Sequence, residues 1–154
     1  MTNKSAYNSL ILILLFLGLT WLRSGWGKLT EGKFVDGLGG VLTKFASNNP
    51  FPWYKSFLQN VAIPNSKIFA YLTMWGEFLT AITVSLAALY LLVVRRRSRL
   101  VLISLGLGLL GGVFLNAIFW LAASYTSPST DSVNLIMLAI ELAGLTFVFR
   151  ELRD

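Results

Sequence analysis

The sequence predicts an all-α fold: an integral membrane four-helix bundle with short amphipathic helices in the first external loop. The chain of 154 residues is 55% hydrophobic and only 13% charged. Its apolar residues form four runs, at about 8–26, 68–94, 100–123 and 133–149. A helix of about 20 apolar residues crosses a bilayer. Because this composition leaves no room for a soluble domain as well, we expect a single transmembrane domain over residues 1–154.

The first span, 8–26, follows a short polar tail that contains Lys4. A cleaved signal peptide is the competing interpretation. Such a peptide needs small residues at its cleavage site, and the bulky Trp21, Leu22 and Arg23 stand there instead. We therefore expect an uncleaved helix, whose end carries the tryptophan and lysine residues typical of a membrane interface.

The segment 30–67 is too polar to cross the membrane. An apolar stripe at helical spacing occurs in each half of it, and a proline-containing break separates the halves. The stripes contain Phe34, Leu38, Val41, Leu42 and Phe45, and then Trp53, Phe57, Leu58 and Val61. We expect two short amphipathic helices that lie on or dip into the membrane surface. They form either an ordinary packed cap over the bundle or a lid over a substrate.

The turn between the second and third spans predicts the topology. It is very short and contains Arg95, Arg96, Arg97 and Arg99. Clustered arginines favour the cytoplasmic side, and counting spans from this turn places both termini in the cytoplasm and segment 30–67 outside. We expect a multi-pass protein of the plasma (inner) membrane. In agreement, all five tryptophans fall near the predicted outer ends of the spans: Trp21, Trp26, Trp53, Trp75 and Trp120.

Two features concern the last two spans. Gly108 and Gly112 are four residues apart, a spacing typical of a helix face on which backbones approach closely. A turn rich in serine and threonine then precedes the fourth span, with Ser129, Thr130 or Asp131 as the candidate N-cap.

The spans contain polar groups that predict a pocket. Glu77 is the one charged residue of the span 68–94. An ionised carboxylate at the centre of a bilayer costs about 2.5–3.5 kcal/mol. Counting about 1.5 Å per residue places Asn116 and Glu141 at a similar depth, with Arg23 closer to the surface. This convergence indicates a buried polar pocket or, equally, a structural ion-pair network that pins the helices together. We expect Arg23 and Glu77 to pair, directly or through Asn116 or water.

The residue types exclude several kinds of chemistry. The chain has no cysteine and no histidine, which rules out disulfides, thiolate nucleophiles and the usual ligand sets of zinc, haem and iron–sulfur clusters. We expect no metal site and no covalently bound cofactor. The net charge of +6 includes the arginine turn, which indicates membrane topology rather than nucleic-acid binding. The expected partners are the lipid bilayer and other membrane subunits.

Four segments together carry a family resemblance. They are LRSGWGKL at 22–29, NPFPWY at 49–54, WGEF at 75–78 and the turn at 127–134. In order and spacing they resemble the DoxX/DoxD family of four-helix bacterial and archaeal membrane proteins, over nearly the whole chain. The resemblance makes Arg23, Trp26, Lys28 and Glu77 the matching family positions.

The DoxD branch of this family is described as the small membrane subunit of thiosulfate:quinone oxidoreductase. The resemblance therefore implies a membrane subunit of a redox complex, with quinone as the candidate ligand and a small sulfur compound as the substrate. A non-catalytic accessory or assembly subunit is the alternative, and a carrier of small solutes is less favoured because no span contains a proline. No catalytic residue is assigned. The candidate pocket comprises Arg23, Trp26, Lys28, Trp75, Glu77, Asn116, Trp120 and Glu141.

Overall fold

The computed structural model describes residues 4–153, and this part of the chain is helical apart from short connections. Its elements are α1 (Lys4–Thr30), α2 (Phe34–Ser47), α3 (Pro52–Phe57), the π-helical turn η1 (Leu58–Ala62), α4 (Ser66–Val93), α5 (Arg99–Ala123), the 3₁₀ turn η2 (Ser124–Thr126) and α6 (Pro128–Arg153). Four helices, α1, α4, α5 and α6, are long and apolar enough to cross a membrane. The predicted fold class, a membrane four-helix bundle, is confirmed.

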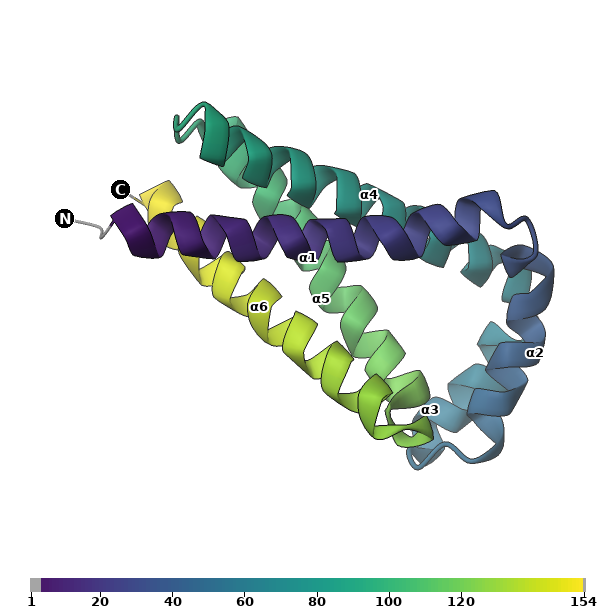
Figure 1. Ribbon diagram of the computed structural model, residues 1–154. Helices are drawn as coiled ribbons and strands as arrows, with labels where there is room; N and C mark the ends of the chain where they lie inside the picture. The colour runs from purple at the N-terminus through teal and green to yellow at the C-terminus, as the bar shows by residue number, and fades with distance from the viewer. Residues whose placement is uncertain (1–3, 154) are drawn as a thin grey trace.

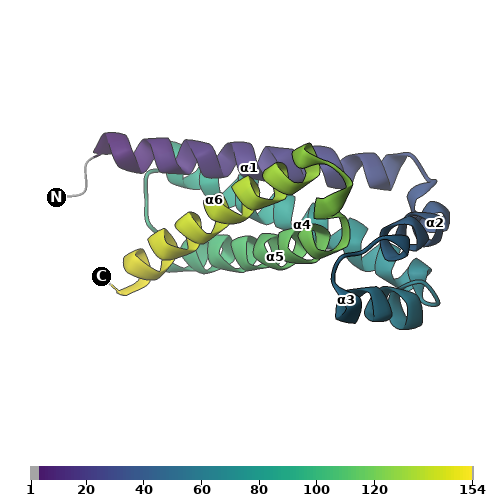
Figure 2. The same cartoon turned by 90° about the horizontal axis from the view of Figure 1, so that it is seen from below.

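The four long helices alternate in direction, so that both chain ends and the α4–α5 turn lie at one end of the bundle (Figures 1 and 2). α1 packs along α4, and α5 packs along α6. Toward the other end these two pairs diverge, and the short helices α2 and α3 lie across the opening (Figure 1). The divergence creates the space in which the candidate site is found.

The core of the bundle is built from side chains of all four long helices. Fully buried members include Ile11, Leu14, Val84, Leu105, Leu109 and Val148. The prediction of a glycine packing face on α5 is confirmed, but its two glycines contact different helices. A side chain at Gly108 would meet Val84 of α4 at 2.9 Å, and one at Gly112 would collide with the Glu141 carboxylate of α6. Both contacts lie inside the bundle, so this glycine face packs against other helices of the same chain.

The helix that contains the fourth predicted span begins before that span. α6 starts at Pro128, and the backbone N–H of Thr130 donates to Ser127 Oγ at 3.1 Å. Ser127 is therefore the N-cap, and the prediction of Ser129, Thr130 or Asp131 was wrong. The physical reason is that proline is favoured at the first helical position. The backbone N–H that proline lacks would have no partner within the helix at that position.

The first amphipathic stripe faces the interior. All five of its residues, Phe34, Leu38, Val41, Leu42 and Phe45, line a cavity between α2 and the long helices. In the second stripe Phe57 and Leu58 also line it, whereas Trp53 and Val61 are exposed. The short helices thus form a cap whose apolar side faces a cavity.

Side-chain hydrogen bonds fasten the cap to the end of α5 and to η2. The Asn49 side-chain amide donates to the Leu121 carbonyl at 2.9 Å, and the Tyr54 hydroxyl donates to the Ile118 carbonyl at 3.0 Å. From the other side, the Tyr125 hydroxyl donates to the Phe45 carbonyl at 2.7 Å. Burial raises the pKa of Tyr54 to about 12, so its hydroxyl keeps its proton at physiological pH. The NPFPWY segment, which contains Asn49 and Tyr54, therefore anchors the cap to the bundle.

Candidate functional site

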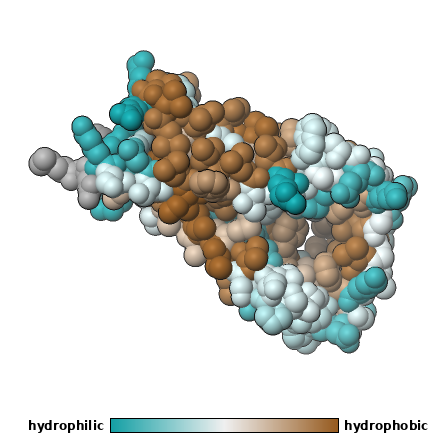
Figure 3. Space-filling view, in the orientation of Figure 1, coloured by the Kyte–Doolittle hydropathy of each residue, from teal (hydrophilic) through white to brown (hydrophobic). Residues whose placement is uncertain are grey.

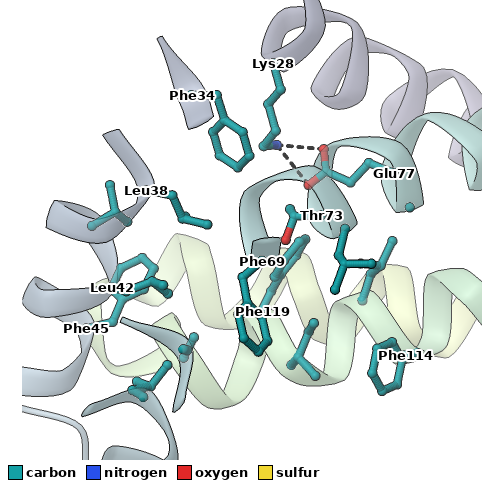
Figure 4. Close-up of a pocket in the computed structure, with 18 of the residues that line it drawn as sticks. Lys28, Phe34, Leu38, Leu42, Phe45, Phe69, Thr73, Glu77, Phe114 and Phe119 are labelled. Carbon is teal, nitrogen blue, oxygen red and sulfur yellow. Dashed lines mark hydrogen bonds and ion pairs between the residues drawn. The ribbon is translucent and has the colours of Figure 1, made fainter. Parts of the chain in front are cut away.

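An ion pair between α1 and α4 forms the polar end of the cavity. Lys28 Nζ lies 2.8 Å from Glu77 Oε1 and 2.6 Å from Oε2. It also donates to Ser24 Oγ at 2.8 Å and lies 5.3 Å from the centre of the Phe34 ring. The lysine therefore bridges α1, α4 and the start of the cap (Figure 4).

A glycine one turn before Lys28 makes this pair possible. A side chain at Gly25 would lie 3.0 Å from the backbone nitrogen of Phe78 and 3.3 Å from the carbonyl carbon of Glu77. Only glycine leaves room for two helix backbones to approach so closely. Because Lys28 follows Gly25 by three residues, it lies on nearly the same face of α1 and reaches Glu77.

The two charges differ in their access to solvent or lipid. The Glu77 side chain is 1% exposed, whereas the Lys28 side chain is 22% exposed. A buried carboxylate depends on its partner, because no water replaces the lost hydration. The stability of the buried Glu77 carboxylate therefore depends on Lys28 more than the stability of the partly exposed Lys28 ammonium depends on Glu77.

The cavity beside this pair has a volume of about 610 Å³, within the range typical of small-molecule sites. It opens on the face shown in Figure 3, where hydrophobic residues line the hollow and more hydrophilic ones lie around its outer rim. Its wall is rich in aromatic rings: Phe34, Phe45, Tyr54, Phe57, Phe69, Phe114 and Phe119. The polar side chains at its boundary are Ser24, Lys28, Thr73, Glu77 and Thr80. Since the lysine and glutamate charges cancel, the cavity favours a neutral and largely apolar molecule.

A second polar cluster is buried inside the bundle. Glu141 Oε1 accepts hydrogen bonds from Trp21 Nε1 and Asn116 Nδ2, both at 2.9 Å, and Oε2 lies 2.9 Å from the same amide nitrogen. The three side chains are at most 3% exposed. No lysine or arginine of residues 4–153 forms an ion pair with Glu141. Gly112 leaves the space that the carboxylate occupies. This cluster joins α1, α5 and α6 and does not line the cavity.

The structure divides the predicted pocket. Lys28 and Glu77 meet at the cavity, and Asn116 and Glu141 meet in the separate cluster. Trp120 Nε1 donates to Asp131 at 2.6 Å, away from both. The remaining three predicted members, Arg23, Trp26 and Trp75, are exposed.

The predicted Arg23–Glu77 pair was wrong, because the partner of Glu77 is Lys28. Five residues separate Arg23 from Lys28, which rotates the two side chains by about 140° around the helix. Arg23 consequently points away from the face of α1 that contacts α4, and it is exposed.

Three residues of the cavity or of the second polar cluster were not predicted from the sequence. Trp21 was placed in an interfacial aromatic belt, but it is 3% exposed and donates to Glu141. Ser24 holds the lysine, and Thr73 lines the cavity. One available signal was the spacing of Trp21, Gly25 and Lys28, which lie at i, i+4 and i+7 and hence on one helix face.

Comparisons of this chain with protein-family models, with curated proteins and with solved structures gave no match. The resemblance to the DoxX/DoxD family therefore rests on the four sequence segments alone. Two of them have a physical explanation in the structure: the glycine and lysine of LRSGWGKL meet the glutamate of WGEF, and NPFPWY fastens the cap.

Proposed function

We propose that this protein is a quinone-binding membrane subunit of a redox complex, with the quinone head group in the cavity beside Lys28 and Glu77. One observation carries the proposal: a cavity of about 610 Å³ has aromatic and aliphatic walls and a single ion pair at one end. Quinones have the matching chemistry, since a flat neutral ring with two carbonyl acceptors is joined to an apolar tail.

The polar groups suit both recognition and proton exchange. Lys28 and the hydroxyls of Ser24, Thr73 and Thr80 are donors for quinone carbonyls. Reduction of a quinone to a quinol takes up two electrons and two protons. In this proposal Lys28 supplies each of the two protons to a ring oxygen, and Glu77, in direct contact with Lys28, passes on a replacement proton from the aqueous side. The electrons come from a partner subunit, which also carries any sulfur chemistry because this chain has no cysteine.

Filling the cavity should weaken quinone binding. Thr73→Phe places a ring in the space where Figure 4 shows the threonine side chain, and we expect decylubiquinone to bind at least about tenfold more weakly. Leu79→Phe is the matched control, because Leu79 is on the same helix, is 60% exposed and does not line the cavity. Quenching of tryptophan fluorescence in detergent micelles measures both. Equal affinities for the two variants would contradict the proposal.

The same pair of variants separates this function from an accessory role. We expect a larger redox partner to co-purify under mild detergent, and Thr73→Phe to lower the quinone-dependent turnover of the complex. A complex that forms normally and turns over at an unchanged rate with Thr73→Phe would favour a non-catalytic assembly subunit.

In the proposed orientation the protein lies in the inner membrane, with the cap on the outer side and the arginine turn in the cytoplasm. Because the chain has no cysteine, single cysteines report topology directly. Asn48 and Arg96 are both exposed, and we expect a membrane-impermeant maleimide to label Asn48→Cys but not Arg96→Cys in intact cells. The reverse labelling would overturn the orientation.

A further inference from the structure

A second cavity, of about 280 Å³, lies at the opposite end of the bundle from the cap. It is lined by Lys4, Tyr7 and Asn8 of α1 and by Arg95 and Arg97 of the α4–α5 turn. Three of its five lining residues are cations, and none is an acid. The proposed quinone site uses none of these residues, so the two sites are independent of each other.

One of the three cations is held in place by its neighbours. Arg97 Nη1 lies 2.6 Å from Glu151 Oε2, and the Arg97 guanidinium carbon lies 4.8 Å from the centre of the Tyr7 ring. These contacts join the turn to α6 and α1 and fix the rim of the cavity. Glu151 neutralises Arg97, but among residues 4–153 neither Lys4 nor Arg95 forms an ion pair. Within residues 4–153, a positive charge of two is therefore left at the cavity.

The backbone of the turn gives the arginines different directions. Arg95 has φ +57°, in the left-handed region that a residue with a side chain rarely adopts. Arg95 and Arg97 line the cavity, whereas Arg96 and Arg99 do not. The arginine turn therefore does two things: two of its side chains form a concave basic site, and the other two lie outside it.

The residues that flank the arginine turn in the sequence are apolar and exposed. Val93 and Val94 precede the arginines with 71% and 52% exposure, and Leu100 follows them with 76% exposure. A basic cavity at a turn that is flanked in sequence by exposed aliphatic residues matches a molecule with an anionic head and acyl chains, whereas a free anion would contact the cations alone.

We propose that this cavity binds the phosphate head group of an anionic phospholipid in the adjacent leaflet. Lys4 and Arg95 contact the phosphate oxygens, Asn8 donates a further hydrogen bond, and Val93, Val94 and Leu100 contact the acyl chains. Basic pockets between transmembrane helices are suited to such head groups because desolvated cations retain a strong attraction for phosphate.

Native mass spectrometry of the full chain in detergent, titrated with dioleoylphosphatidylglycerol, tests this site. We expect Lys4→Gln/Arg95→Gln to weaken the tightest lipid adduct by about 30-fold. The matched control, Arg96→Gln/Arg99→Gln, removes the same charge from outside the cavity and should change the affinity by less than about threefold. Dioleoylphosphatidylcholine, which has no net charge, should bind all variants equally and weakly.

Three results would overturn the proposal. Equal weakening by the two double variants would show a diffuse attraction instead of a site. Equally tight binding of the zwitterionic lipid would exclude recognition of the anionic head group. Displacement of the lipid adduct by millimolar inorganic phosphate would assign the cavity to a free anion. Should a double variant fail to fold, the single variants Arg95→Gln and Arg96→Gln give the same comparison.

Discussion

Replacing Lys28 with methionine is expected to lower the free energy of unfolding by about 3–5 kcal/mol. The reason is that Glu77, whose side chain is 1% exposed, loses its cation while remaining buried. Glu77→Leu should cost less, because the Lys28 side chain is 22% exposed and can turn its ammonium group toward the surface. Unfolding by sodium dodecyl sulfate in mixed micelles measures both changes.

The double variant Lys28→Met/Glu77→Leu should be markedly more stable than the sum of the two single losses predicts, since neither charge is then left alone. Lys67 and Asp36 provide the control, an ion pair of 3.4 Å whose side chains are 74% and 77% exposed. Removing either of these two should change stability by at most about 1 kcal/mol. Strictly additive losses at Lys28 and Glu77 would mean that the two residues do not interact.

Glu141→Leu is expected to be nearly as damaging, by a different mechanism. It leaves the Trp21 indole N–H and the Asn116 amide without their acceptor at a site that is almost completely buried. Each unsatisfied buried donor costs about 1–3 kcal/mol, so we expect a loss of about 2–6 kcal/mol.

Glu141→Gln is the matched variant for this cluster. Its side-chain oxygen still accepts from Trp21, and its amide can donate to Asn116 once the asparagine amide turns over. We expect a loss of about 1 kcal/mol or less, since shape and hydrogen bonds are kept. Similar destabilisation by the leucine and glutamine variants would show that the negative charge of Glu141, rather than its role as an acceptor, holds the three helices together.

The spans could be predicted from the sequence because length and apolar character suffice to identify them. The predicted span 68–94 and the helix Ser66–Val93 nearly coincide. Two helices extend beyond the predicted spans, because polar residues continue each helix beyond its apolar part. α1 runs to Thr30 instead of residue 26, and α6 starts at Pro128 instead of residue 133. Hydropathy reports what crosses a membrane, whereas capping and backbone hydrogen bonds determine where a helix stops.

The pairing within the site was predicted less well, because depth along a helix says nothing about direction around it. Glu77 was recognised as costly and Glu141 as a polar group at a similar depth, and each does have partners. The prediction that Arg23 pairs with Glu77 rested on depth alone. Arg23 and Lys28 differ by about 140° in direction around the helix, so Arg23 does not face Glu77. A face-by-face comparison of α1 would have placed Trp21, Gly25 and Lys28 together.

The apolar stripe of α2 shows a similar limit. Its spacing predicted an amphipathic helix, and that helix is present at Phe34–Ser47. The stripe has the same pattern whether it rests on lipid, on a packed core or on a cavity. In this protein the stripe faces a cavity because the long helices diverge (Figure 1). That divergence depends on contacts between residues far apart in the sequence.

Photolabelling with an azido-quinone tests the central claim most directly. The protein is illuminated with the probe in lipid nanodiscs, and the labelled residues are identified by mass spectrometry. We expect saturable labelling of cavity residues such as Phe34, Leu42, Phe69 and Thr73, abolished by excess unlabelled quinone and reduced in Thr73→Phe. Labelling restricted to lipid-facing residues such as Leu107 and Ile136, 64% and 59% exposed, would contradict a quinone site beside Lys28 and Glu77.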